Sequence, residues 1–97
     1  MKAISFVWDQ TKAESNLKKH KISFEEAQTV FSDPNARMIF DPEHSEKEDR
    51  FILLGISSGL SILVVCHCYI EDDMVIRIIS ARKANKNEQK QYGSFLL

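Results

Sequence analysis

Three apolar runs that follow one another at very short intervals limit most strongly what this chain can fold into. Residues 51–57, 61–70 and 74–81 are rich in Ile, Leu and Val, which favour β-strands. Only residues 58–59 and the acidic segment 71–73 mark the connections, and connections this short join antiparallel strands. The sequence therefore predicts an antiparallel three-stranded meander in the second half of the chain.

The length of the chain, 97 residues, is enough for one hydrophobic core and too short for two. The longest apolar run, residues 60–70, is too short to cross a membrane, and Asp9 precedes any long apolar stretch. We therefore expect a single domain over residues 1–97 that has neither a signal peptide nor a membrane span and stays in the cytoplasm. The apolar tail at 94–97 is expected to be a flexible end or a docking segment.

The first part of the chain predicts one short strand and two helices. Residues 4–8 alternate like a strand and end at Asp9, a favoured N-cap, so a helix should follow to about residue 21. The capping box of Ser23 and Glu26 predicts the start of a second helix. A polar stripe beside the buried edge of the first helix consists of Lys12, Asn16 and Lys19.

The remaining elements complete an α+β fold. Residues 37–40 are expected to be extended and to lead into an exposed charged loop. Asn85 and Glu88 predict the start of a last helix, whose only large apolar residue before the tail is Tyr92. The expected order is β-α-α-β-β-β-β-α, with an antiparallel sheet packed against the N-terminal helices.

Positive charge is concentrated at both ends of the chain, although the net charge is only −1. Residues 1–24 carry five lysines and two acids, and residues 74–97 carry five basic residues and one acid. Residues 25–73 carry eleven acids and three basic residues. A fold that brings the two ends together would make a positive face suited to a polyanion. The alternative is that these charges are simply solvated on exposed faces.

The last predicted hairpin contains an arginine that needs a partner. A three-residue turn at 71–73 would place His67 opposite Arg77 on one face of the sheet. Arg77 lies among apolar residues of a central strand, where an unpartnered guanidinium would be costly. One interpretation is an ion pair with a carboxylate from a helix, such as Glu26; the other is a phosphate clamp that Arg82 extends.

The predicted strands lack the carboxylates that metal-dependent cleavage of nucleic acid requires. No Asp or Glu occurs in residues 51–70 or 74–87. We therefore expect no metal cofactor. A chain of this kind that cuts nucleic acid would use imidazole and guanidinium groups, with the substrate's own 2′-hydroxyl as nucleophile. Such chemistry favours RNA over DNA.

The two cysteines predict buried thiols in a reducing compartment. Cys66 and Cys68 share one face of a strand, whereas His67 between them points to the other face. Three ligands for a metal ion are therefore not brought together, and a disulfide between the two cysteines would distort the strand. His20 is open to two interpretations, an ordinary histidine at a helix end or a functional group. Trp8 is expected to be a core residue, with base stacking as the alternative.

Two blocks of the sequence, residues 8–27 and 77–84, together resemble the BrnT family of toxins from type II toxin–antitoxin systems. The residues that carry this resemblance include Trp8-Asp9, Lys12-Ala13, Asn16, Lys19-His20, Phe24, Arg50-Phe51, His67 and Arg77-Ile78-Ile79-Ser80-Ala81-Arg82. The resemblance implies a RelE-like fold and a ribonuclease activity that halts translation. It also implies neutralisation by a BrnA-like antitoxin with a ribbon-helix-helix part that binds DNA.

The predicted site of a metal-independent endoribonuclease combines these observations. Arg77 and Arg82 would hold the scissile phosphate and stabilise its developing charge. His67 is the first candidate for proton transfer, His20 is the second, and Tyr92 is a further donor. The residues expected to bind RNA are Lys12, Lys19, Lys83 and Lys86.

Two other functions remain open from the sequence. The acidic middle and the basic ends could form a non-catalytic module that binds a partner protein or nucleic acid. An autonomous DNA-binding repressor is less favoured, because no helix-turn-helix or ribbon-helix-helix pattern occurs in the chain. We expect contact with DNA only through the antitoxin.

Overall fold

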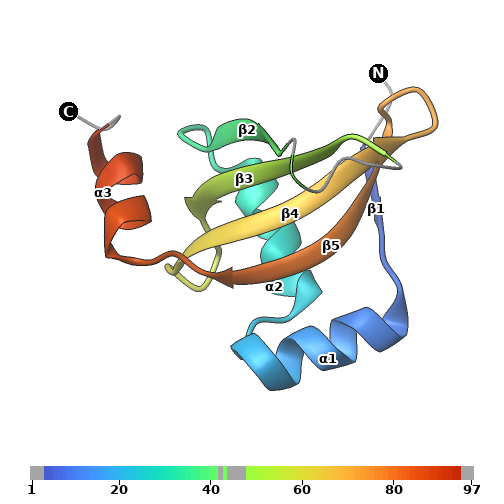
Figure 1. Ribbon diagram of the computed structural model, residues 1–97, viewed down its shortest axis with the longest axis horizontal. Helices are drawn as coiled ribbons and strands as arrows, with labels where there is room; N and C mark the ends of the chain where they lie inside the picture. The colour runs from blue at the N-terminus through green and yellow to red at the C-terminus, as the bar shows by residue number, and fades with distance from the viewer. Residues whose placement is uncertain (1–3, 42, 44–47, 95–97) are drawn as a thin grey trace.

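The chain folds into a five-stranded sheet and three helices, seen in a computed structural model that describes residues 4–41, 43 and 48–94 (Figure 1). In chain order the elements are β1 (Ser5–Val7), α1 (Gln10–His20), α2 (Phe24–Thr29), a turn of 3-10 helix η1 (Val30–Ser32), β2 (Arg37–Asp41), β3 (Arg50–Ile56), β4 (Ile62–Ile70), β5 (Val75–Lys83) and α3 (Lys86–Ser94). Residues 95–97 of the predicted tail lie outside the described residues.

The sheet is mixed, with the strand order β1-β5-β4-β3-β2. The predicted meander is present, because β3, β4 and β5 pair antiparallel with one another, and β2 adds antiparallel to β3. The expectation of a wholly antiparallel sheet is wrong at β1, which runs parallel to β5 and pairs with residues 75–77. The short β1 leaves the outer edge of β5 free for another element beyond residue 77.

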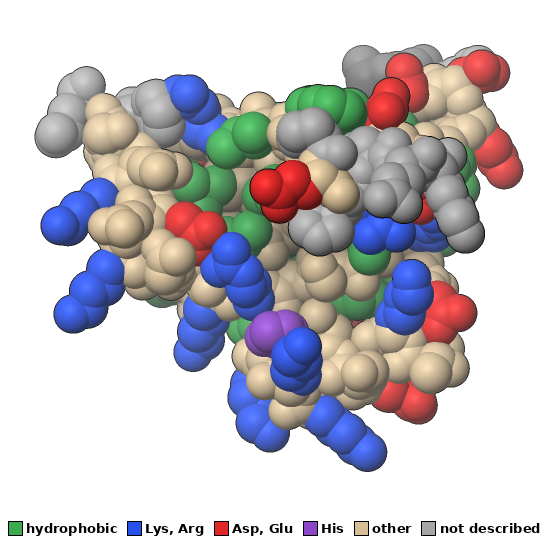
Figure 2. All heavy atoms as spheres, viewed as in Figure 1, with side chains coloured by type: hydrophobic (Ala, Val, Ile, Leu, Met, Phe, Trp, Pro, Cys, Tyr) green, Lys and Arg blue, Asp and Glu red, His purple; other side chains and the backbone are tan. Residues whose placement is uncertain are grey.

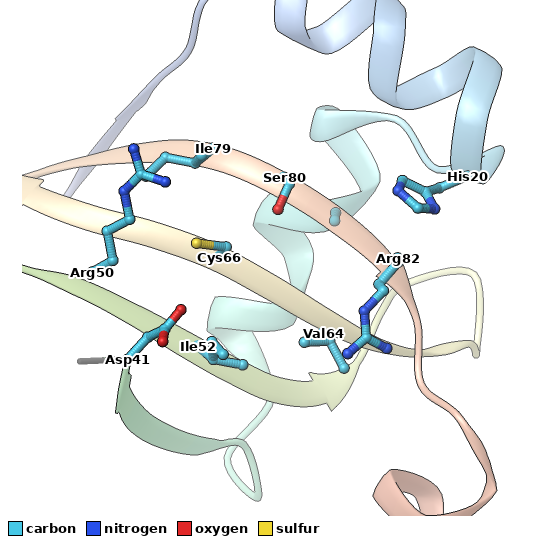
Figure 3. A pocket seen from close by; sticks show the side chains of 10 residues that line it. His20, Asp41, Arg50, Ile52, Val64, Cys66, Ile79, Ser80 and Arg82 are labelled. Atoms are coloured by element: carbon cyan, nitrogen blue, oxygen red, sulfur yellow. The ribbon is translucent and has the colours of Figure 1, made fainter. Parts of the chain in front are cut away.

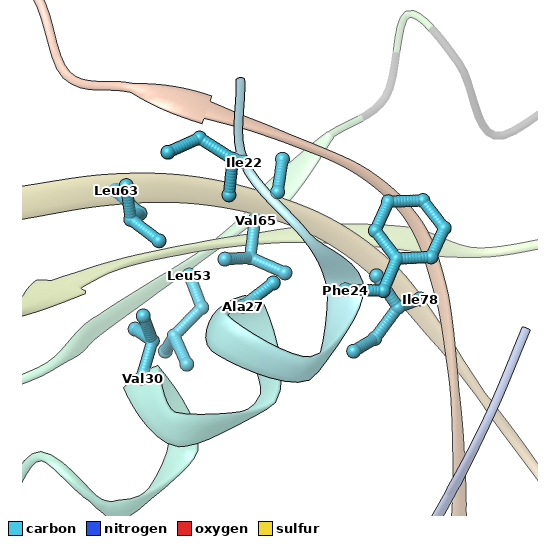
Figure 4. Close-up of a cluster of buried hydrophobic side chains, with 9 residues drawn as sticks. Ile22, Phe24, Ala27, Val30, Leu53, Leu63, Val65 and Ile78 are labelled. Carbon is cyan, nitrogen blue, oxygen red and sulfur yellow. The ribbon is translucent and has the colours of Figure 1, made fainter. Parts of the chain in front are cut away.

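The main core lies between α2 and one face of the sheet (Figure 4). The first residues of α2 and η1 bury their apolar side chains completely against side chains of β3, β4 and β5. The members of this core are Ile22, Phe24, Ala27, Val30, Leu53, Leu63, Val65, Ile78 and Ala81. Because no described helix covers the middle of the opposite face, that face is open to solvent in its centre (Figure 1).

A smaller core fixes α3 at one end of the open face. Tyr92 of α3 is only 4% exposed and packs with Leu54, Val64 and Ala84. The predicted capping box is confirmed, because Asn85 Oδ1 accepts from Glu88 N and Glu88 Oε1 accepts from Asn85 N, both at 2.8 Å. This helix therefore depends on one aromatic anchor and its N-terminal cap.

The caps of the first two helices also agree with the sequence. Asp9 Oδ1 accepts from Lys12 N at 2.9 Å, and Ser23 Oγ accepts from Glu26 N at 3.0 Å. The Glu26 carboxylate does not close the capping box; it accepts instead from Ser57 Oγ at 2.6 Å. Within the described residues, no helix is long and apolar enough to span a bilayer.

The register of the β4–β5 hairpin differs from the predicted one by a single step. Ile70 pairs with Val75, so four residues separate the paired ends where three were expected. Arg77 consequently lies opposite Cys68, and His67 lies opposite Ile78. The predicted placement of His67 beside Arg77 is wrong, because the two side chains point to opposite faces of the sheet.

A β-bulge then changes the register again. Cys66 pairs with Ser80 while His67 pairs with Ile78, so Ile79 is an extra residue in β5. In a regular strand Arg77 and Arg82, five positions apart, would point to opposite faces. The extra residue brings both arginines to the open face of the sheet.

Candidate functional site

A groove of about 260 Å³ lies on the open face of the sheet, between α1 and the strands β2 to β5 (Figure 3). Its lining residues are His20, Asp41, Arg50, Ile52, Val64, Cys66, Ile79, Ser80, Ala81 and Arg82. An apolar floor with charged groups around it is the usual composition of a binding site. The groove is therefore the best candidate for a functional site on this chain.

Two guanidinium groups lie at opposite ends of this groove. Arg50 reaches into it from β3, and Arg82 reaches into it from β5, with Cys66 and Ser80 between them (Figure 3). Arg50 lies directly across from Asp41 in the β2–β3 ladder. Two planar cations on one open surface can bind an anionic ligand such as a phosphodiester.

Arg82 is held in place by a carboxylate of α3. Its Nη1 and Nη2 atoms donate to Glu88 Oε1 and Oε2, each at 2.8 Å, in a two-point ion pair. The hydrogen bonds that Arg82 donates to Glu88 raise the pKa of Arg82 and lower the pKa of Glu88. The side chain of Arg82 is still 43% exposed. A ligand can therefore reach this guanidinium while Glu88 orients it.

His20 stands where the groove meets a second hollow beside α1. This hollow of about 190 Å³ shares His20, Ile79 and Ser80 with the groove and is also lined by Lys12 and Lys19. The two hollows therefore adjoin each other at these shared residues. Lys12 and Lys19 of α1 line the second hollow, and His20 lies where the two hollows meet.

The side chain of Asn16 fixes α1 against β5. Its Nδ2 donates to Ala81 O and to Ile22 O, both at 2.9 Å, and its Oδ1 accepts from Ala81 N at 3.1 Å. The amide thus pairs with the free edge of β5 as a neighbouring strand would. The predicted polar stripe is divided, because Asn16 is buried whereas Lys12 and Lys19 are exposed.

Both cysteines are free thiols, as expected. Cys66 lies in the floor of the groove, and burial raises its pKa. Cys68 is 1% exposed and lies beneath Arg77 on the same face, and burial raises its pKa as well. No three His, Cys, Asp or Glu side chains among the described residues are close enough together to hold a metal ion.

Arg77 lies outside the groove, in an ion pair with Glu48. Arg50 Nη2 is 3.9 Å from the same Glu48 oxygen atom. The predicted carboxylate partner exists, but it comes from the segment before β3 and not from a helix; Glu26 is bonded elsewhere. The hydrogen bond that Arg77 donates to Glu48 raises the pKa of Arg77. Arg77 and Arg82 therefore do not form the predicted clamp in the groove, because only Arg82 lines it.

His67 is completely buried on the helix-covered face, away from the groove. Its ring meets Phe31 edge-on, with the ring centroids 4.8 Å apart, and one ring nitrogen lies 3.2 Å from Val65 O. Burial lowers the pKa of His67 and keeps the imidazole neutral. This histidine is a core residue that lacks access to a substrate on the open face.

Tyr92 and two of the predicted lysines also lie away from the groove. The Tyr92 hydroxyl donates to Asp33 Oδ2 at 2.6 Å beneath α3, and burial together with this bond raises its pKa to about 12. Lys83 and Lys86 are exposed at the end of β5 and the start of α3, outside the lining of the groove. They extend the basic surface without entering the site.

The charge pattern of the sequence reappears on the open face (Figure 2). Lysine and arginine side chains gather along α1 and α3, whereas carboxylates gather at the upper right near the β4–β5 turn. The two basic ends of the chain thus flank the same depression. This arrangement favours an anionic ligand at the depression.

Sequence reasoning missed Arg50, Asp41 and Ser80 as residues of the site. Arg50 was visible only as part of a motif, and its position on the groove depends on the register of β3. Ser80 enters through the bulge at Ile79. No periodicity in the sequence marks that bulge.

Comparison with known proteins identifies the family. The family model described as "Ribonuclease toxin, BrnT, of type II toxin-antitoxin system" matches residues 8–88. The chain belongs to the BrnT family. A solved BrnT, the ribonuclease toxin of Brucella abortus, has the same fold, with a TM-score of 0.66 and 23% sequence identity. The match covers 87% of this chain and 100% of the Brucella chain. None of the curated proteins compared with the chain matches it.

Membership of the BrnT family places the groove in a ribonuclease toxin of a type II system. The family match includes α1, the strands β2 to β5 and the start of α3, so it covers every residue that lines the groove. The likeness to the Brucella BrnT confirms the α+β architecture.

Proposed function

We propose that this chain is the toxin of a type II toxin–antitoxin pair, a single RelE-like domain that cleaves RNA in the groove on the open face of the sheet. The observation that carries the proposal is the meeting of His20, Arg50 and Arg82 on one depression whose extension is lined by Lys12 and Lys19. Cations along a groove bind the RNA backbone, and guanidinium groups stabilise charge on a phosphate in the transition state.

The proposed reaction needs no metal ion. The 2′-oxygen of the substrate attacks the adjacent phosphorus, the bond to the 5′-oxygen breaks, and the products are a 2′,3′-cyclic phosphate and a 5′-hydroxyl. His20 takes the proton from the 2′-hydroxyl, and the leaving 5′-oxygen takes a proton from solvent. Arg82, oriented by Glu88, and Arg50 hold the phosphate oxygens. His67 and Tyr92 have no part in this reaction, because both are buried away from the groove.

The expected consequence in the cell is inhibition of translation through loss of RNA. We propose that a BrnA-like antitoxin with a ribbon-helix-helix part neutralises the toxin, and that contact with DNA occurs through that partner. The type II family description supports an antitoxin partner for this chain.

The direct test is incubation of the purified chain with a single-stranded RNA in excess chelator. We expect cleavage with cyclic phosphate ends, and no cleavage of an RNA whose scissile nucleotide carries a deoxyribose. Loss of cleavage on chelation that Mg²⁺ restores would contradict the metal-free reaction. Cleavage of the deoxy-substituted strand would contradict the 2′-hydroxyl as nucleophile.

The second candidate is a non-catalytic module, which the segregated charge of the chain favours. Expression in cells separates the two functions. The enzyme predicts growth arrest by the unaltered chain and relief by a folded Arg82→Ala variant. The matched control is Lys83→Ala, which removes the neighbouring exposed cation outside the groove and should still arrest growth. An unaltered chain that does not affect growth or cleave RNA would favour the module.

A further inference from the structure

β2 is an edge strand whose central side chains are apolar and exposed. It ends the strand order of the sheet, so one of its edges lacks a partner strand among the described elements. Met38 and Ile39 are each 52% exposed and Phe40 is 47% exposed. Because successive residues of a strand point to opposite faces, apolar surface is presented on both sides of β2. Edge strands are normally protected by central charges, proline or a covering element.

A hollow of about 470 Å³ adjoins this strand. Its apolar walls are Met38, Phe51 and Tyr69. Phe51 makes edge-to-face contacts with Tyr69 and with Phe40, with ring centroids 5.5 Å and 5.6 Å apart. The Tyr69 hydroxyl donates to Met38 Sδ at 3.1 Å. These contacts hold the aromatic wall in place. The hollow can therefore receive an apolar side chain without rearrangement.

The rim of the same hollow is acidic. Glu48, Asp49 and Asp73 line it, and Asp49 and Asp73 are exposed. The β4–β5 turn adds two exposed carboxylates, Glu71 and Asp72, next to Asp73. This charge repels a nucleic acid and attracts lysine or arginine side chains.

We propose that the free edge of β2 and this hollow bind an extended segment of a partner protein in which an apolar residue has Lys or Arg two positions to either side. The segment pairs with β2 as an added strand through main-chain hydrogen bonds. The apolar side chain enters the hollow between Met38, Phe51 and Tyr69. The cations two positions away point to the same face of the added strand and meet Asp49 and Asp73.

The hollow is separate from the proposed ribonuclease site, although β2 also contributes Asp41 to the groove. None of the residues that line the hollow lines the groove or its extension beside α1. The inference therefore stands whether or not the chain cleaves RNA. Unchanged hydrogen exchange of the β4 amides serves as the control for the fold of every variant.

The test uses the full chain and two short synthetic peptides, one with Lys or Arg two positions to either side of a Leu or Val and one with Glu at each cationic position. Titration calorimetry measures affinity, and hydrogen exchange measures protection of the β2 amides. We expect the cationic peptide to bind and to protect β2, with affinity about tenfold or more weaker for Met38→Lys and for the double variant Asp49→Lys, Asp73→Lys. The control Leu60→Lys makes the same apolar-to-cation change at a side chain that is 81% exposed in another turn, and it should bind normally.

Four results would overturn the proposal. They are failure of the cationic peptide to bind, equal binding of the Glu peptide, equal weakening by Leu60→Lys, and binding of a single-stranded RNA that Met38→Lys abolishes. Sedimentation gives a further check: a dimer of the unaltered chain that Met38→Lys converts to a monomer would identify a second copy as the occupant of the edge and would likewise overturn the proposal.

Discussion

The side-chain amide of Asn16 pairs with both main-chain polar atoms of Ala81, donating to its carbonyl oxygen and accepting from its N–H. One side chain thus continues the hydrogen-bond ladder of β5 beyond the short β1. The contact sets the distance between α1 and the sheet. It thereby places His20, four residues later on the same helix, over the groove.

The first prediction concerns this contact. Asn16→Ala removes three buried hydrogen bonds and leaves the Ala81 N–H and two carbonyls without partners, so it should lower the free energy of unfolding by about 3 kcal/mol. Urea denaturation measures the change. Ser15→Ala, on the exposed side of the same helix, should change the free energy of unfolding by less than about 0.5 kcal/mol. Similar losses in both variants would show that helix propensity alone explains the effect.

His20 of α1 and His67 of β4 should differ sharply in their effect on RNA cleavage. His20→Ala should lower the cleavage rate by about 10²–10⁴-fold and leave RNA binding nearly intact, because it removes proton transfer and not the cations. His67→Gln, if folded, should cleave at a rate close to that of the unaltered chain. Single-turnover assays with an end-labelled RNA measure both rates. The reverse pattern would restore His67 as the proton-transfer residue.

The Glu88–Arg82 pair predicts a pH dependence of stability. The pKa of Glu88 in the folded chain lies below its ordinary value of 4.5, because Arg82 and the Asn85 N–H bond its carboxylate. The pair therefore stabilises the fold fully above pH 4.5, and this stabilisation is lost as the pH falls through the lowered pKa. Glu88→Gln should cost at most about 1 kcal/mol near neutral pH, because the pair is partly exposed.

Denaturation curves at neutral and strongly acidic pH test this linkage. The difference in unfolding free energy between the unaltered chain and Glu88→Gln should shrink in acid. A difference that is constant with pH would show that the carboxylate charge does not contribute.

The Tyr92–Asp33 hydrogen bond predicts the opposite dependence at high pH. Burial and Asp33 raise the pKa of Tyr92 from 10 to about 12, so its contribution is present below pH 10 and is lost as the pH rises through 12. Tyr92→Phe should lower the free energy of unfolding by about 1 kcal/mol near neutral pH and flatten the alkaline loss of stability. Normal RNA cleavage by this variant would agree with a structural role; a loss of cleavage with unchanged stability would contradict it.

The elements of this fold followed from local patterns of the sequence. The caps at Asp9, Ser23 and Asn85 marked helix starts, and the three apolar runs marked the meander. Such signals depend on neighbouring residues only. The parallel pairing of β1 with β5 depends on residues about 70 positions apart in the chain, and no local pattern reports it.

The candidate site was predicted only in part, because it depends on register. The turn between β4 and β5 has four residues where three were expected, which puts Arg77 and His67 on opposite faces, and the bulge at Ile79 brings Arg82 to the open face. The helical wheel places Asn16 in a polar stripe beside the buried edge of α1. Its amide is buried because it forms hydrogen bonds with the free edge of β5. Lys12, Lys19, His20 and Arg82 were predicted and do lie together.

The extra residue in β5 also links the number of residues between Arg77 and Arg82 to the shape of the strand. A deletion of Ile79 would give a regular ladder in which Ser80 stays opposite Cys66 and Arg82 stays opposite Val64, so both arginines would still share the open face. An insertion of one residue into a strand that kept this single bulge would instead turn every later side chain to the other face, and Arg82 would then face the apolar layer beneath α2. Homologues that keep this site should therefore have either a spacing of five residues with the bulge or a spacing of four residues with a regular ladder.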